Sequence, residues 1–325
     1  MLDPVLVGDI GGTNVRLAEA MRDDDGALLL DDVRVLAGAD HDDFEAALEY
    51  YLHQRNHRVC KQALFAFAGP VIDNTIEMTN RNWFINGQRL AGKFGFETVT
   101  LVNDYAAMAR SIPELPDSVF ETLHAGARPK TRAPILVAGP GTGLGVATLL
   151  PDGHTGWRVI TGEGGHAAFA PRTQLEWTLA ERLRDRFEYV SKELVLSGSG
   201  MDAVHRAICE IYGVPWVRTP PAQLLDEAKR EPGIARDICQ IRARATLDAL
   251  GDAAVTNGTT GGVVITGGVA VRLADWLREP ESLARFFNRG PKQSYMMPIP
   301  IRLLHSGQAA LIGAAALHYD EEMAA

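Results

Sequence analysis

The glycine-rich segment near the start of the chain constrains its fold more than any other feature. Apolar residues stand on both sides of the run from Gly8 to Asn14, and both flanks suit strands better than a helix. The pattern predicts a β-hairpin over residues 6–18. Its tip carries glycines, which let another molecule come close to the backbone. An ordinary glycine-rich hairpin turn has the same composition, so this segment alone leaves the function open.

The tip has the composition of a phosphate-binding loop. Successive N–H groups of a glycine-rich turn form a concavity that binds anions, and Thr13 and Asn14 add neutral donors. Asp9 would repel a bare phosphate, but it suits a Mg²⁺ ion that bridges phosphates, usually through water. The segment therefore predicts a site for magnesium-bound phosphate groups.

Length, charge and cysteine content exclude several classes of protein. The 325 residues exceed one comfortable hydrophobic core, so we expect two domains. The net charge of −9 argues against nucleic-acid binding, and the sequence has no apolar run long enough to span a membrane. The three cysteines form neither a disulfide framework nor a CxxC metal site. Because the N-terminus also lacks the pattern of a secretory signal, we expect a cytoplasmic protein.

A second glycine-rich loop lies in the middle of the chain. Residues 134–138 predict a strand that leads into Gly139-Pro140-Gly141-Thr142-Gly143-Leu144-Gly145, and the apolar run 146–150 predicts a returning strand. A dinucleotide-binding loop would open a helix at this point, and no Walker-type GxxxxGK[ST] motif occurs in the sequence. We therefore predict a nucleotide held between two α/β domains, and we disfavour a nicotinamide-dependent dehydrogenase.

Two residue pairs follow other predicted strands. Asn103-Asp104 follows the strand 98–102, and Gly267-Gly268 follows the strand that begins at Gly262. A carboxylate can position an attacking hydroxyl and accept its proton, while an adjacent amide fixes a neighbouring hydroxyl. A glycine pair lets a flat base lie close to the backbone. A turn or a helix cap would explain Asn103-Asp104 equally, and a simple turn would explain Gly267-Gly268.

Three polar side chains suggest a pocket for a sugar. Glu163 and His166 stand three positions apart in a glycine-rich loop, and Glu193 follows in a short segment before Ser197-Gly198-Ser199-Gly200. Acids and a neutral imidazole suit sugar hydroxyls, each of which both donates and accepts a hydrogen bond. A metal site is the alternative for Glu163 and His166, but no third ligand stands at a suitable spacing. Taken alone, Glu193 would be interpreted as a solvated charge on a helix.

Six motifs in one order make the chain resemble the bacterial glucokinases of the non-zinc type. They are GDIGGTN, LVNDY, AGPGTGLGVA, GEGGHAAFAP, VSKELVLSGSG and ITGGV. The resemblance implies an α/β, two-domain actin-like (ribonuclease H-like) ATPase fold, with a cleft between a small and a large domain. We expect residues 1–112 plus 307–325 to form the small domain and 113–306 the large one, with 113–134 as the connection.

The resemblance also implies a reaction and roles for single residues. The reaction is the ATP- and Mg²⁺-dependent phosphorylation of D-glucose at its 6-hydroxyl, with Asp104 as general base and Asp9 near the metal. The implied sugar-binding residues are Asn103, Asp104, Glu163, His166 and Glu193. The implied nucleotide-binding residues are Gly8, Asp9, Ile10, Gly11, Gly12, Thr13, Gly141, Thr142, Gly143, Gly267 and Gly268, the last two near adenosine.

Alternative functions remain open at this point. A sugar-binding regulator without turnover would need the same pocket but neither Asp9 nor Asp104. A kinase of the same fold could use another hexose, or polyphosphate in place of ATP. The resemblance further suggests a homodimer, which composition and pattern do not address.

Overall fold

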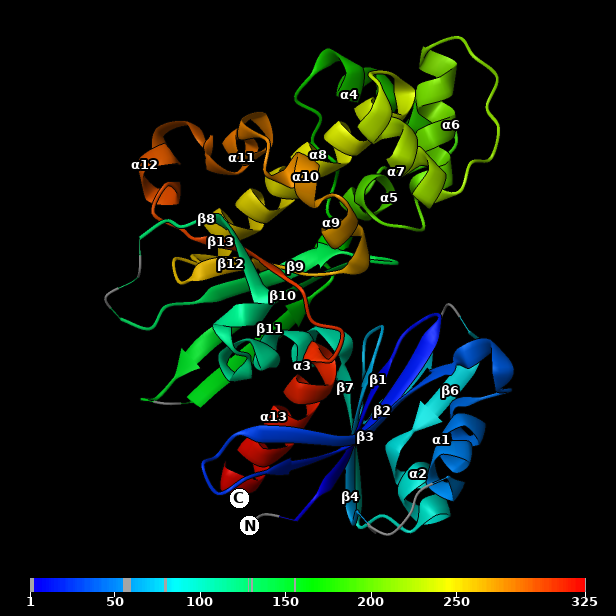
Figure 1. The fold of residues 1–325 in the computed structure, drawn as a ribbon, viewed down its shortest axis with the longest axis vertical. Coiled ribbons are helices and arrows are strands. Elements are labelled where there is room, and N and C mark those ends of the chain that lie inside the picture. The colour runs from blue at the N-terminus through cyan, green and yellow to red at the C-terminus, as the bar shows by residue number, and fades with distance from the viewer. Residues whose placement is uncertain are drawn as a thin grey trace. The chain divides into compact units, whose positions relative to one another are not determined.

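The computed structural model describes residues 3–54, 60–78, 81–127, 129, 131–154 and 156–324, and the chain divides into two compact units (Figure 1). The first unit comprises Met1–Asp117, Pro151–Thr161 and Ser306–Ala325. The second unit comprises Ser118–Leu150 and Gly162–His305. The domain boundaries expected from the sequence stay a proposal.

A mixed five-stranded sheet of order β3-β2-β1-β4-β7 forms the centre of the first unit. Its antiparallel part joins β1 (Val5–Ile10) to β2 (Asn14–Arg22), and β2 to β3 (Leu28–Ala37). Its parallel part joins β1 to β4 (Gln62–Phe67), and β4 to β7 (Thr98–Asn103). The parallel strands end at one edge of the sheet, where ligands of α/β proteins usually bind.

Helices cover both faces of this sheet, because alternate residues of its strands are apolar on opposite faces. Leu6 and Ile10 of β1 belong to a core that includes residues of α1 (Phe44–His53) and α2 (Gly87–Phe94). The alternate residues Val5 and Val7 belong to a second core with α3 (Asp104–Ser111) and α13 (Ala309–Ala324). A small sheet of β5 (Thr75–Met78) and β6 (Trp83–Asn86) completes this unit.

The second unit contains β10, β9, β12, β13 and β8 of a six-stranded sheet whose order is β11-β10-β9-β12-β13-β8. The sequence predicted β9 (Ile135–Pro140), β10 (Leu144–Asp152) and β12 (Gly262–Ile265), and it missed three strands: β8 (Phe120–His124), β11 (Gly156–Gly162) and β13 (Ile301–Leu304). β8 lies inside the segment 113–134 that we expected to be only a connection, of which residues 128 and 130 are outside the described part.

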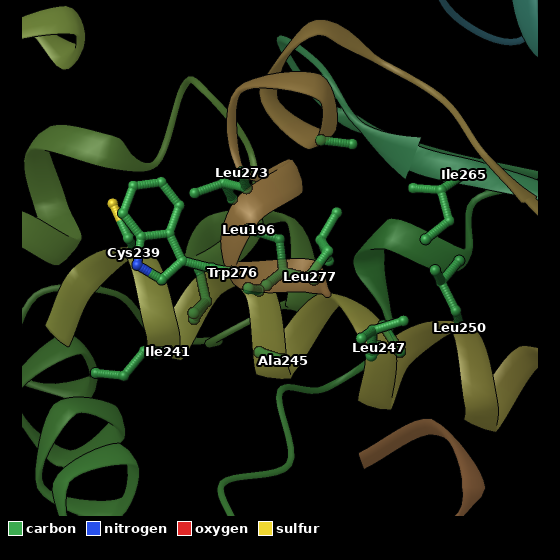
Figure 2. Close-up of a cluster of buried hydrophobic side chains, with 14 of the residues drawn as sticks. Leu196, Cys239, Ile241, Ala245, Leu247, Leu250, Ile265, Leu273, Trp276 and Leu277 are labelled. Carbon is green, nitrogen blue, oxygen red and sulfur yellow. The ribbon is translucent and has the colours of Figure 1, made fainter. Parts of the chain in front are cut away.

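The long helix α8 (Ile234–Asn257) organises the core of the second unit. Its apolar side chains pack with Leu196 of α5 (Lys192–Leu196), with Trp276 and Leu277 of α10 (Ala274–Leu277), and with Leu273, which lies between α9 (Gly268–Arg272) and α10 (Figure 2). The other helices of this unit are α4 (Gln174–Arg184), α5 (Lys192–Leu196), α6 (Met201–Ile211), α7 (Pro221–Arg230), α9 (Gly268–Arg272), α10 (Ala274–Leu277), α11 (Pro280–Phe287) and α12 (Gln293–Met296). Within the described ranges, no helix has the length and apolarity to cross a membrane.

Candidate active site

The first glycine-rich segment folds as the predicted hairpin. Ile10 at the end of β1 pairs with Val15 of β2, and the turn between them is closed by a hydrogen bond from Gly11 N to Asn14 O of 3.0 Å. Thr13 at the tip is exposed. The tip therefore reaches the surface of the first unit, as a phosphate-binding loop must.

Two residues of this segment lie inside the protein. Gly8 is buried in β1, and a Cβ atom there would lie 2.8 Å from Cδ1 of Phe65. Packing against Phe65 therefore explains this glycine. The Ile10 side chain is fully buried in the core. Neither residue is therefore exposed at the surface of the hairpin.

Asp9 is partly buried beside the hairpin and forms an ion pair with Arg16, whose Nη1 lies 2.9 Å from Oδ2. Burial raises the pKa of the Asp9 carboxyl, and the charge and hydrogen bond of Arg16 act in the opposite direction. No group of three or more His, Cys, Asp or Glu side chains that could hold a metal exists in the described part of the chain. Asp9 therefore suits Mg²⁺ only together with nucleotide phosphates and water, the usual ligands of this ion.

Asn103 and Asp104 lie at the same sheet edge as the first loop. Ile10 pairs with Phe67, and Phe67 with Asn103, so the ends of β1, β4 and β7 stand in one row. Two strand spacings, about 10 Å, separate the first loop from the start of α3. The first unit thus brings a candidate base and a candidate phosphate loop to one edge.

Asn103 also serves as the helix cap that the sequence left as an alternative. Its Oδ1 accepts a hydrogen bond from Tyr105 N at 2.9 Å, and its Nδ2 donates to Gly69 O at 3.0 Å. Tyr105 N also lies 2.9 Å from Oδ1 of Asp104. These contacts fix the orientation of both side chains, and fixed orientation is compatible with a catalytic role as well as with capping.

The second glycine-rich loop is a strand-loop-strand turn, as predicted. Leu144 of β10 pairs antiparallel with Pro140 of β9, so no helix follows the loop. The loop residues are hydrogen-bonded to the turn before α6, with Gly198 N donating to Gly141 O at 2.8 Å and Ser199 N to Thr142 O at 3.1 Å. The Gly141–Gly143 loop is therefore held by a segment more than fifty residues later in the chain.

Gly267 lies directly against this loop. A Cβ atom on Gly267 would lie 2.4 Å from Pro140 O, and one on Gly139 would lie 1.9 Å from Thr266 O. Gly267 also has a φ of +94°, a conformation that glycine adopts readily. Close contact between the end of β9 and the end of β12 thus requires both glycines, and it leaves Gly268 exposed at the start of α9.

Glu193 is part of this assembly and is not a solvated helix charge. Its Oε2 accepts a hydrogen bond from Leu144 N at 2.7 Å, and the side chain is 27% exposed. A Cβ atom on Gly143 would lie 2.6 Å from the same oxygen. The glycine in the second loop therefore makes room for the Glu193 carboxylate.

Glu163 and His166 are exposed side chains on the 3₁₀ turn η4 (Gly164–His166). This turn packs tightly on β10, because a Cβ atom on Gly165 would lie 2.3 Å from Leu144 O. Nε2 of His166 lies 4.0 Å from Oε1 of Glu193. The second unit thus brings Glu193 to the second glycine-rich loop and His166 near Glu193, while Glu163 directly precedes the turn η4 that packs on this loop.

A pocket of about 590 Å³, which no sequence motif predicted, lies beside this loop. It begins at the Gly198-Ser199 turn, and Asp202 and Arg218 form an ion pair of 3.0 Å on its wall. This turn lies directly before α6. The lining residues are Gly198, Ser199, Met201, Asp202, Arg218, Thr219, Pro220 and Pro221.

Comparisons with known proteins show the family to which the chain belongs. The model of the Glucokinase family matches residues 6–321. A glucokinase of Hahella chejuensis is 35% identical over 98% of this chain and 98% of its own length. A crystal structure of glucokinase from an Antarctic psychrotroph is 30% identical, with a TM-score of 0.86 over 98% of this chain and 100% of that chain.

A more distant structure shows the same fold with ligands. It is a ROK family glucokinase from Streptomyces griseus in complex with glucose and AMPPNP, with a TM-score of 0.64, 19% identity, and coverage of 97% of this chain and 98% of that chain. The fold and the loops place this chain among the sugar kinases of the actin-like ATPase fold, which confirms the predicted fold class. Within that class, the chain belongs to the glucokinase family.

Proposed function

We propose that the chain catalyses transfer of the γ-phosphoryl group of ATP to the 6-hydroxyl of D-glucose, giving glucose 6-phosphate and ADP. The observation that carries the proposal is the contact between Glu193 and the second glycine-rich loop, which joins the sugar-binding side chains to a phosphate-binding turn. Membership of the glucokinase family over residues 6–321 supports the same reaction.

Asp104 is the proposed general base. A phosphoryl acceptor needs positioning and a group that takes its proton, and a carboxylate at the start of a helix supplies both. The hydrogen bond from Tyr105 N orients the carboxylate, and Asn103, held by Gly69 O, orients a neighbouring sugar hydroxyl. The site lies at the sheet edge that also carries the first phosphate loop.

Glu163, His166 and Glu193 are the proposed partners of the other ring hydroxyls. The carboxylates accept hydrogen bonds, and a neutral imidazole both donates and accepts. A buried hydroxyl without its partner costs about 1–3 kcal/mol, which is enough to discriminate among hexoses.

For ATP, we propose that the two glycine-rich loops bind the phosphates and that Gly267 and Gly268 lie near adenosine. The pocket that opens at Gly198 and Ser199 is large enough for a base and ribose. Asp9 would hold Mg²⁺ through water, and the bound ion would neutralise charge on the β- and γ-phosphates. The glycine-rich loops would then position the phosphates and donate hydrogen bonds to them.

A coupled assay for glucose 6-phosphate tests the proposal. It compares glucose, mannose and fructose as acceptors and ATP and polyphosphate as donors, with an ATPase control that contains no sugar. Turnover that requires glucose, with little background hydrolysis, is the expected result. Folded protein that binds glucose but turns over no sugar would favour the regulator, and activity with another hexose or with polyphosphate would correct the substrate.

Asp104→Asn tests the assignment of the base. We expect kcat to fall about 10²-fold to 10⁴-fold, the range for loss of a general base. The KM for glucose should change much less, because asparagine keeps a hydrogen-bonding side chain. Asp24→Asn, in an exposed turn of the same unit, is the matched control. Near-normal turnover of the Asp104 variant would contradict the assignment.

The proposal includes a homodimer, which the family resemblance suggests, and a cytoplasmic location, which rests on the N-terminal sequence and the cysteine content. Sedimentation equilibrium of the purified protein measures the assembly directly, and a mass of one chain at all concentrations would remove the dimer from the proposal. Fractionation of cells that express the chain tests its location.

A further inference from the structure

Arg81 contacts the backbone carbonyl groups of the first glycine-rich loop. Its Nε and Nη2 donate hydrogen bonds to Gly12 O at 2.9 and 2.8 Å, and Nη2 also lies 3.2 Å from Thr13 O. The contact joins residues almost seventy positions apart in the chain. No motif of the sequence pointed to this arginine, which precedes β6.

The guanidinium of Arg81 is itself fixed by two neighbours. It lies 4.7 Å from the ring centroid of Trp83, a buried residue whose Nε1 donates to Asp42 O at 2.8 Å. On another side lies Gly38, where a Cβ atom would be 2.3 Å from Nη2 of Arg81. Gly38 N also donates to Thr13 O at 2.9 Å. A larger residue at 38 would displace the arginine.

We propose that Arg81 is a positioning residue for nucleotide binding, which holds the first loop in its phosphate-binding conformation. The inference rests on the proposed function of that loop. In a trans peptide the carbonyl and the N–H point to opposite sides, and the chain has no cis bond among its described residues. Because Arg81 holds the carbonyl of Gly12, it directs Thr13 N–H to the opposite side of the loop.

Two physical effects favour an arginine at this position. The planar guanidinium donates two parallel hydrogen bonds and stacks on an aromatic ring, which an ammonium group cannot do in the same way. Its charge also lies close to where the phosphates would bind, and this charge attracts them. The hydrogen-bond geometry of Arg81 and its positive charge therefore both favour phosphate binding. The Arg81→Lys variant separates the two effects, because lysine keeps the charge but not the two parallel hydrogen bonds.

Isothermal titration with AMPPNP and Mg²⁺ tests the inference without any requirement for turnover. We expect Arg81→Ala to raise the Kd by about tenfold or more, the effect of losing charge-assisted hydrogen bonds that preorganise the loop. Arg81→Lys should recover only part of the affinity, and the KM for glucose should be unchanged in both. Circular dichroism melts accompany each titration.

Arg34→Ala is the matched control. Arg34 also belongs to the first unit, donates to a backbone carbonyl, Gln54 O, at 3.0 Å, and lies 5.6 Å from the ring of Tyr51. Loss of this arginine should leave the Kd for AMPPNP unchanged. Equal weakening by Arg34→Ala would show a general structural effect and overturn the inference.

Other outcomes separate this inference from the proposed function. Wild-type affinity in a folded Arg81→Ala variant would overturn the positioning role while leaving the kinase proposal intact. If Arg81→Ala does not fold, full wild-type affinity of Arg81→Lys for AMPPNP would overturn the role of the two parallel hydrogen bonds that the guanidinium donates. Wild-type protein that binds AMPPNP in an Arg81-dependent way but phosphorylates no sugar would refute the proposed reaction and support the inference. Absence of AMPPNP binding by the wild type would overturn both.

Discussion

The contact between α3 and α13 offers a test of how the candidate base is positioned. Gly313 of α13 faces the backbone of α3, where an ideal Cβ atom would lie 1.6 Å from Ala107 O and 2.9 Å from Ser111 N. In Gly313→Ala the methyl group meets backbone, which cannot rotate away as a side chain can. The Cβ–oxygen separation must grow from 1.6 Å to at least 3.0 Å, a displacement of about 1.4 Å.

This displacement acts on Asp104, because Asp104 is the first residue of α3. An ion pair resists the separation of the helices, since Arg110 Nε lies 2.6 Å from Oδ2 of Asp320 and Nη2 lies 3.0 Å from Oδ1. A misplacement of about 1 Å can cost 10²-fold in rate. We therefore expect kcat to fall by about two orders of magnitude.

The same substitution changes stability in a direction that can be estimated. Overpacking costs about 1–3 kcal/mol, while alanine gains up to about 1 kcal/mol over glycine in a helix. A net loss in the free energy of unfolding should therefore appear in urea denaturation followed by circular dichroism. Steady-state kinetics under the coupled assay give kcat for the folded variant.

Gly92→Ala is the control for this prediction. Gly92 lies in α2 of the same unit, and a Cβ atom there would have no neighbour within 4 Å. The control should be as stable as the wild type or more stable by up to about 1 kcal/mol, with unchanged kcat. Wild-type kcat and stability in Gly313→Ala would refute the steric argument.

Two further predictions concern the second unit. Glu193→Ala should raise the KM for glucose by about 5-fold to 150-fold, equivalent to 1–3 kcal/mol. Glu193→Gln keeps an acceptor for Leu144 N and should preserve the conformation of the second glycine-rich loop. An unchanged KM in the alanine variant would remove Glu193 from the sugar site. Burial lowers the pKa of His205, which packs edge-on against Trp216. Because the unfolded chain then binds protons more readily, the wild type should lose unfolding free energy as the pH falls from 7 to 5. His205→Phe should lose less in urea titrations at the two pH values, and equal losses would contradict this linkage.

Local sequence patterns predicted much of the fold. The short apolar runs on both sides of the glycine-rich turn predicted the β1–β2 hairpin, and the β-branched run after Gly145 predicted a strand where a dinucleotide-binding loop would require a helix. Such patterns are readable because a strand or a turn depends on residues within a few positions of one another. The short strands β8 and β13 escaped notice, since their pairing partners lie tens of positions or more away in the chain. Strand β11 follows its partner β10 directly, but most of its residues are exposed, so it lacks a buried apolar run.

Both the sequence motifs and the structure were needed to describe the candidate site. The motifs named Asn103, Asp104 and Glu193 as chemically suitable, and their side-chain types justified that choice. The sequence could not decide whether Asn103 is a cap or whether Glu193 is solvated. The structure shows Asn103 capping α3 and Glu193 bound to Leu144 N.

The sequence by itself thus determined the class of the chain, the two phosphate-type loops and the kinds of side chain available for the chemistry. The tertiary structure alone decided what surrounds these groups. Phe65 explains the glycine at position 8, Ala107 explains Gly313, and Arg81 holds the loop at Gly12. Each of these contacts joins residues that are tens or hundreds of positions apart, so no local pattern encodes it. Close packing of the folded chain creates both the steric limits and the fixed hydrogen bonds.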